Sequence, residues 1–240
     1  MRKEWERFGF MERKERIRNA YRLVGSNSFY DGMMTCSTFL GRAVSRLVWD
    51  MNAEDSAEYQ TRALAGIPEG FSGRLLEVPV GTGVLTMPLY QTLPDADIVC
   101  LDYSPDMMAQ AEEKAKRLEL SNVAFHQGDV GALPFADADF DIVVSLNGFH
   151  AFPDKEAAYR ETFRVLKSDG VFCGCFYVAG ACRRTDWFIR RIYQPLKFFA
   201  PPYETMESLD ARLKSMYERV ELSHVKGIAC FVCCQKHSGV

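Results

Sequence analysis

The stretch Leu75-Leu76-Glu77-Val78-Pro79-Val80-Gly81-Thr82-Gly83 decides the fold of this chain. Its apolar part, Leu75 to Val80, predicts a buried strand, and the glycines at its end predict a sharp turn. The next residues, Val84 to Leu89, predict the start of a helix. A strand that runs through glycines into a helix N-terminus is typical of a cofactor cradle, because glycine has no Cβ and lets a ligand approach the backbone.

Two common nucleotide cradles fit this stretch poorly. A dinucleotide fingerprint requires a glycine where this chain has Thr86, and a phosphate-binding P-loop requires a lysine that does not follow Gly83. The stretch instead resembles motif I of the class I S-adenosylmethionine (SAM)-dependent methyltransferases, in which an acidic residue precedes alternating glycines. Pro79 departs from that motif, because it stands where the first glycine usually lies.

A second apolar run, Ile98 to Leu101, predicts a strand that ends at Asp102. Ser104 is a favourable N-cap for the helix that follows, Pro105 suits its first position, and Asp106 suits its positive end. An acid at the tip of the second strand, about 20 residues past the glycines, can accept hydrogen bonds from ribose hydroxyls. NAD-binding folds share such an acid, so Asp102 indicates a ribose more than it indicates SAM.

Further elements follow in the order of the same family. Val123 to Val130 predicts a third strand and Phe140 to Leu146 a fourth, Asp154 to Leu166 predicts a helix, and Lys167 to Gly170 predicts a turn into a fifth strand. Together they are very similar to the small-molecule branch that includes the ubiquinone/menaquinone-type (methyltransferase type 11) enzymes. The resemblance covers roughly residues 70–180.

The resemblance implies an α/β fold. We expect a Rossmann-like, seven-stranded, mostly parallel sheet with an antiparallel C-terminal hairpin, helices on both faces and an N-terminal helical lid. The expected divisions are 1–69 for the N-terminal helices or lid, 70–180 for the SAM-binding core, 181–216 for a lid or substrate insertion, and 217–240 for the C-terminal strands.

The resemblance also implies which residues bind SAM. The expected cofactor-binding residues are Tyr30, Glu77, Val78, Pro79, Gly81, Gly83, Asp102, Tyr103, Met107, Asp129, Val130, Asn147 and Gly148. Glu77 and the backbone of Gly81 and Gly83 would hold the methionine part, and Asp102 would hold the ribose. The residues expected around the adenine are Met107, Asp129 and Val130, and those expected at the methyl-transfer end are Asn147 and Gly148. Taken singly, the glycines also fit a plain turn and the acids fit solvated caps, but ligands of such folds bind at the carboxyl ends of the strands, where all of them fall.

The resemblance predicts methyl transfer from SAM to a small, apolar or aromatic acceptor at an O, C or N atom, by in-line displacement. His150 follows the fourth strand and is a candidate catalytic base, since histidine titrates near neutral pH. A packing histidine is the alternative for His150. A SAM-binding protein without turnover, acting as a partner or regulator, is the alternative for the whole chain.

Composition fits a soluble enzyme. The 240 residues carry a net charge of −3 and are 48% hydrophobic, which argues against a nucleic-acid partner. RNA amino-methylating relatives carry an Asn/Asp-Pro-Pro-Tyr/Phe motif after the fourth strand, where this chain has Asn147-Gly148-Phe149-His150. No apolar run has transmembrane length and the N-terminus lacks a signal-peptide pattern, so we expect a cytoplasmic protein.

Eight cysteines are present, and six of them fall in expected strands. Free cysteine packs there as a small hydrophobe. Cys230 and Cys233 would point to opposite faces of a strand, so we expect no metal site. Arsenic-methylating relatives carry a cysteine near the end of the fourth strand, and this chain has none there.

The flanks are expected to select the acceptor. Residues 2–22 predict an amphipathic helix, and Tyr30-Asp31 is similar to the lid of the quinone-type relatives. The basic, aromatic stretch Arg183 to Phe199 predicts a lid helix that Pro195 breaks. An acceptor pocket, a membrane-surface helix and a dimer contact stay open for this stretch, and the chain is expected to be a monomer or a homodimer.

Overall fold

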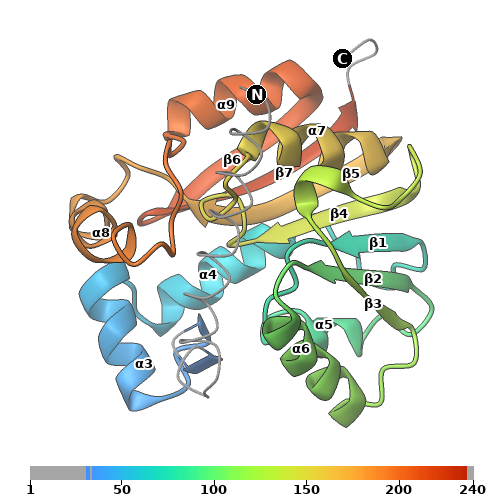
Figure 1. Cartoon of the computed structure of the whole chain (residues 1–240), viewed down its shortest axis with the longest axis horizontal. Helices are drawn as coiled ribbons and strands as arrows, with labels where there is room; N and C mark the ends of the chain where they lie inside the picture. Colours follow the sequence, from blue (N-terminus) through green and yellow to red (C-terminus); the bar gives the residue numbers. More distant parts are fainter. Residues whose placement is uncertain (1–30, 33, 237–240) are drawn as a thin grey trace, which may run out of the picture.

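The alternating apolar runs form a seven-stranded sheet with helices on both faces (Figure 1). The structure, a computed structural model, describes residues 31–32 and 34–236. Tyr30 and the expected helix over residues 2–22 lie outside the described residues. The expected fold class is confirmed, including the antiparallel hairpin at the end of the chain.

The strand order across the sheet is β3-β2-β1-β4-β5-β7-β6. The first five strands pair in parallel, whereas β7 runs antiparallel to both of its neighbours. The strands are β1 (Arg74–Glu77), β2 (Asp97–Asp102), β3 (Val123–Gln127), β4 (Phe140–Leu146), β5 (Leu166–Tyr177), β6 (Tyr217–Val225) and β7 (Ile228–Lys236). The order reverses between β1 and β4, and a reversal of this kind opens a crevice at the carboxyl ends of these strands.

Helices cover the sheet and frame this edge. They are α3 (Phe39–Val44), η1 (Ser45–Trp49), α4 (Ala53–Leu64), α5 (Met87–Tyr90), α6 (Pro105–Arg117), η2 (Val130–Ala132), α7 (Lys155–Val165), α8 (Arg183–Phe188), η3 (Ile189–Tyr193) and α9 (Met206–Met216). The predicted start of α6 is confirmed: the Ser104 side chain caps it and Pro105 occupies its first turn. A long loop joins α8 and η3 to α9.

Alternate strand residues pack on opposite faces of the sheet, as the two-residue period of a strand requires. Leu75 and Ile98 lie in the core cluster that α4, α5 and α6 cover, and Leu76 and Val99 lie in the cluster that α7 and α9 cover. The strand cysteines follow the same rule. Cys230 belongs to the first cluster and its near neighbour Cys233 to the second, so their side chains leave opposite faces of β7.

Three elements differ from the expected bounds. The first strand ends at Glu77 instead of Val80, because Pro79 has no N–H to continue the ladder. The helix after the glycines begins at Met87 rather than Val84, since Pro88 is tolerated only in a first turn. The expected turn at residues 167–170 lies within β5, which pairs with β4 through Leu166 before its register shifts.

The stretch predicted as a helix after β5 is helical over α8 and η3, and the helix ends at Tyr193, before Pro195. It packs against the segment that precedes α4. The hydroxyl of Thr185 donates a hydrogen bond to the backbone oxygen of Val48, and Arg184 forms an ion pair with Asp50. No helix within residues 31–32 and 34–236 is long and apolar enough to cross a membrane.

Candidate functional site

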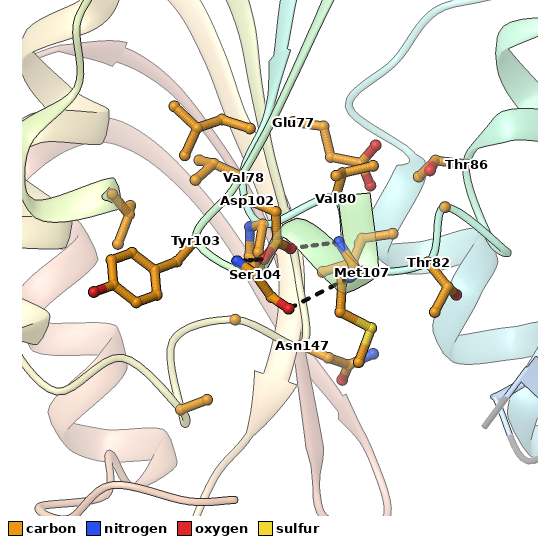
Figure 2. A pocket seen from close by; sticks show the side chains of 18 of the residues that line it. Glu77, Val78, Val80, Thr82, Thr86, Asp102, Tyr103, Ser104, Met107 and Asn147 are labelled. Carbon is orange, nitrogen blue, oxygen red and sulfur yellow. Dashed lines mark hydrogen bonds between the residues drawn. The ribbon is translucent and has the colours of Figure 1, made fainter. Parts of the chain in front are cut away.

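The carboxyl ends of β1, β2 and β4 open into one pocket (Figure 2). Every predicted cofactor residue that the structure describes lines it. They are Glu77, Val78, Pro79, Gly81, Gly83, Asp102, Tyr103, Met107, Asp129, Val130, Asn147 and Gly148. The topology brings them together, because parallel strands that neighbour each other end at the same edge of the sheet.

Asp102 joins the second strand to the glycine loop. One oxygen of its carboxylate accepts a hydrogen bond from the backbone N–H of Gly81, and the other accepts one from Ser104, each over 2.8 Å. Asp102 is only 7% exposed, and burial raises its pKa to about 6. Each oxygen keeps a lone pair beyond its backbone bond, so the carboxylate can also accept from a ligand hydroxyl.

Glu77 is the second acid of the pocket, and it is almost completely buried. Its carboxyl accepts hydrogen bonds from the Tyr90 hydroxyl, over 2.9 Å, and from the Cys100 thiol. Burial raises the pKa of Glu77 to about 8 in spite of these bonds. The charged carboxylate is therefore costly here until a cation compensates it.

The two buried carboxyl groups fit a cationic ligand that carries hydroxyl groups, because carboxylates attract cations and accept hydrogen bonds. The hydrogen-bond partners of Glu77 and Asp102 are uncharged, and within the described part of the chain neither acid forms an ion pair with a lysine or arginine. SAM carries an ammonium and a sulfonium charge together with ribose hydroxyls. The residues present therefore suit SAM in charge and in hydrogen bonding.

The two glycines of the loop have different roles. Both have positive φ, +57° at Gly81 and +67° at Gly83. A Cβ on Gly81 would meet nothing within 4 Å, whereas a Cβ on Gly83 would lie 2.8 Å from the Cγ of Met87. Gly81 therefore leaves open space beside the pocket wall, and Gly83 lets the loop pack on α5.

Pro79 occupies the position at which motif I usually has its first glycine. A Cβ on Gly148 would collide with the ring of Pro79 and would lie 2.7 Å from the Cζ of Phe152. The proline ring and Gly148 are therefore matched in shape. Next to them, Asn147 has a φ of +54°, and its N–H donates to the Cys175 oxygen over 2.7 Å. That bond holds the Asn147 backbone at the pocket wall.

The described part of the N-terminal segment reaches the glycine loop. The Thr82 hydroxyl donates a hydrogen bond to Asp31 over 2.6 Å, and the other oxygen of Asp31 lies 2.8 Å from Nζ of Lys114. Met34 lines the pocket. Since Tyr30 lies outside the described residues, its expected contact with the cofactor stays a prediction.

Sequence reasoning missed several lining residues. Thr82 lies inside the quoted stretch and Thr86 lies three residues after it, and their position between and after the glycines was the available signal. Met34 carries no such signal, because only the packing of a distant segment brings it to the pocket. Phe152 follows Gly148 by four residues, and its N–H donates a hydrogen bond to the Gly148 oxygen in the turn after β4.

His150 lies behind the pocket wall. It is 5% exposed, it is not among the lining residues, and its ring stacks on Phe199 with 4.1 Å between centroids. Its Nδ1 accepts a hydrogen bond from the backbone N–H of Tyr177, and burial lowers its pKa to about 3. The catalytic role of His150 stays a prediction, and this burial opposes it.

A smaller cavity adjoins the main pocket. The two share Met34 and Asn147, and the smaller cavity is also lined by Trp49, Met51 and Tyr59. Its wall is mostly apolar. Within the described residues, no group of three or more His, Cys, Asp or Glu side chains is placed to hold a metal ion.

Comparisons with known proteins agree with this geometry. A family described as "Methyltransferase domain" matches residues 72–220. A demethylmenaquinone methyltransferase from Thermus thermophilus is 41% identical over 97 residues, which cover 40% of this chain and 44% of that protein. One from Geobacillus sp. is 30% identical over 166 residues, which cover 66% of this chain and 70% of that protein.

The chain thus matches less than half the length of the Thermus relative. Among solved structures, a SAM-dependent methyltransferase from Aquifex aeolicus superposes with a TM-score of 0.56 at 16% identity. That match covers 80% of this chain and 92% of the other, and it supports the fold alone.

Proposed function

Because the chain belongs to the methyltransferase-domain family, we propose that it transfers the methyl group of SAM to a small, ring-containing, apolar acceptor of the quinone or hydroquinone class. The observation that carries the cofactor assignment is the pair of hydrogen bonds from Gly81 and Ser104 to the buried Asp102. The demethylmenaquinone methyltransferases among its relatives support the acceptor class.

We assign each part of SAM to the residues whose charge and hydrogen-bonding groups suit it. Asp102 accepts the ribose hydroxyls, and the open backbone at Gly81 receives the methionine part. Glu77 compensates the positive charge of the ligand. Tyr103, Met107, Asp129 and Val130 surround the adenine, and Val78, Pro79, Asn147 and Gly148 line the remaining wall.

The acceptor is assigned to the side of Asn147 that faces the smaller cavity. Trp49, Met51 and Tyr59 offer an apolar and aromatic wall there, which suits a ring. The rim that this cavity shares with the cofactor pocket, at Met34 and Asn147, is where the two reactants would meet.

Bound SAM supplies a methyl group that its sulfonium already activates for in-line displacement. The chain contributes orientation and the exclusion of water, which together are worth up to roughly 7–11 kcal/mol. Among residues 31–32 and 34–236, those that line the two cavities include no histidine or lysine. We therefore favour an electron-rich ring carbon as the nucleophile, because it needs little help from a base before it attacks.

The first experiment is calorimetric titration with SAM and with its demethylated product, for the parent chain and for Asp102→Ala. We expect micromolar binding that the substitution weakens at least tenfold. A screen with labelled SAM and with quinols and phenols then tests turnover. A folded parent chain that binds neither ligand contradicts the cofactor assignment, and tight binding without methyl transfer to any ring acceptor contradicts the acceptor class.

A further inference from the structure

A basic and apolar surface lies at the end of the molecule formed by α3 and α8. Within the described residues, all of the large apolar side chains that are exposed belong to two segments, 39–47 and 187–196. They are Phe39, Leu40, Leu47, Trp187, Ile192 and Leu196. Phe39 is 82% exposed, Leu47 58% and Trp187 55%, so these side chains stand in solvent instead of packing in the core.

The two segments are neighbours in space. Figure 1 shows α3 and α8 at the end of the molecule away from β3 and α6. The ion pair of Arg184 with Asp50, at 2.8 Å, and the buried bond from Thr185 to Val48 join the residues that flank the two segments. We call the exposed side chains of residues 39–47 and 183–197 the basic-apolar surface.

The charge of this surface opposes that of the whole chain, which is −3. Besides Arg184, the surface carries Arg42, Arg46, Arg183, Arg190, Arg191 and Lys197, and all of them are exposed. Asp50 pairs with Arg184, and Asp186 accepts hydrogen bonds from Tyr177 and Gly180. The nearby acids are thus engaged, and apart from Arg184 the cations of this surface form no ion pair within the described part of the chain.

We propose that the basic-apolar surface docks on an anionic lipid bilayer. Arginine interleaved with tryptophan, phenylalanine and leucine is the pattern of helices that lie in a membrane interface: apolar side chains enter the acyl boundary and cations meet the headgroups. Each cation near an anionic surface strengthens binding by roughly fivefold. The six cations other than the paired Arg184 lie beside six exposed apolar side chains, so the surface supplies both contributions.

Charge favours an anionic bilayer over two other occupants of this surface, a second copy of the chain and residues 1–30. A second copy would bring the same cations against themselves if the surfaces met symmetrically, and the two would repel. Residues 1–30 carry eight cations and four acids, so their sign also matches that of the surface instead of complementing it. An anionic bilayer satisfies the charges and the apolar side chains at once.

The surface continues inward toward the smaller cavity. In the π-helix η1, Arg46 and Leu47 are exposed on the surface, whereas Ser45 and Trp49 line that cavity. A chain docked through η1 would present this cavity near the bilayer. This last link rests on the proposed function, because it assumes that a lipid-soluble acceptor enters there; the docking itself does not.

The test is co-sedimentation of the full chain with vesicles. One set is pure phosphatidylcholine, and the other contains phosphatidylcholine and phosphatidylglycerol in roughly equal parts. We expect at least tenfold tighter binding to the anionic vesicles, weakened by salt. Arg190→Gln/Arg191→Gln should weaken it on the order of tenfold or more, and Leu47→Ser/Trp187→Ser should weaken it on both vesicle types.

A matched control removes two exposed cations from α6, at the other end of the molecule. Lys116→Gln/Arg117→Gln should bind vesicles like the parent chain. Calorimetry with SAM on every variant separates the two proposals: unchanged SAM binding with weakened vesicle binding supports docking, whatever the acceptor proves to be.

Three outcomes overturn the proposal. The first is a parent chain that binds neither vesicle type, or binds both equally. The second is a control variant that loses as much binding as Arg190→Gln/Arg191→Gln. The third is a concentration-dependent dimer, or a complex with an RNA oligonucleotide, that the surface substitutions abolish while vesicle binding stays unchanged.

Discussion

The carboxylate of Asp102 accepts the backbone N–H of Gly81 over 2.8 Å, and this bond joins the tip of β2 to the loop after β1. The two residues come from different strands, yet they form one wall of the pocket. The same carboxylate can therefore set the shape of the glycine loop and bind a ligand hydroxyl. Its substitution should affect cofactor binding through both routes.

We expect Asp102→Asn to weaken SAM binding about 10- to 100-fold, because a hydrogen bond to a charged group is worth about 1.5–3 kcal/mol. Calorimetry at neutral pH measures the change. Asp106→Asn is the matched control, since Asp106 is an exposed acid on the first turn of α6 outside the pocket lining. If Asp102→Asn binds SAM as tightly as the parent chain does, Asp102 does not bind the ribose.

Glu77 makes SAM binding depend on pH. Its pKa is about 8 in the free protein, so at pH 7 the carboxyl is mostly protonated and must lose its proton to meet a cation. Affinity for SAM should rise by up to about tenfold per pH unit toward pH 8 and then level off. Calorimetric titrations with SAM in buffers of different ionisation enthalpy would show whether binding releases a proton. If Glu77→Gln still releases the proton, the proton comes from another group.

The same group makes the ligand-free protein less stable as pH rises. The unfolded state loses the Glu77 proton near pH 4.5 and the folded state near pH 8, so its stabilising contribution is complete below pH 4.5 and is lost by pH 8. The free energy of unfolding should fall by up to about 1.4 kcal/mol per pH unit in this window. Glu77→Gln should flatten the fall while weakening SAM binding, as denaturant titrations at several pH values would show.

The sequence predicted most of the sheet and gathered residues that line one pocket, because both depend on local patterns. Apolar runs that end in Asp102 or Asp129 mark strand tips, and the parallel topology then gathers the tips at one edge. Contacts that depend on the packing of distant segments could not be predicted in this way. The burial of His150 under Phe199, and the approach of Asp31 to Thr82, join segments that no local period relates.

Element ends were predicted less well for a related reason. The expected strand over 75–80 and the expected helix start at Val84 ignored what the prolines forbid within the same stretch. Pro79 removes a ladder donor and Pro88 must lie in a first turn, so both boundaries move. Both prolines are visible in the sequence, but the predicted boundaries followed its hydrophobic pattern instead.

The two glycines of the loop should respond differently to alanine. Gly83→Ala combines a left-handed φ, which costs about 1–2 kcal/mol, with a Cβ placed 2.8 Å from Met87, so it should lower the free energy of unfolding by about 2–4 kcal/mol. Gly81→Ala carries only the backbone cost, because its Cβ meets open space. Denaturant titration measures both changes.

Gly81→Ala should instead weaken the binding of SAM, because the added methyl group enters space that we assign to the cofactor. We expect at least tenfold weaker binding in a chain that stays folded. Parent-like affinity in Gly81→Ala would show that the ligand does not approach the loop backbone at this position.

His150 provides a test of general-base catalysis. Its pKa of about 3 keeps the ring neutral across the working range, and Nδ1 is occupied by the Tyr177 N–H. We expect His150→Asn, whose amide oxygen can still accept that bond, to keep turnover within about threefold of the parent chain at saturating acceptor.

His150→Ala should mainly lower the free energy of unfolding, by about 1–3 kcal/mol, because it removes the stack on Phe199. The pH profile of turnover separates the roles: a base at His150 requires a loss of at least about 100-fold in folded His150→Asn, together with the loss of one ionisation from the profile, whereas a packing residue leaves the profile unchanged and moves only stability.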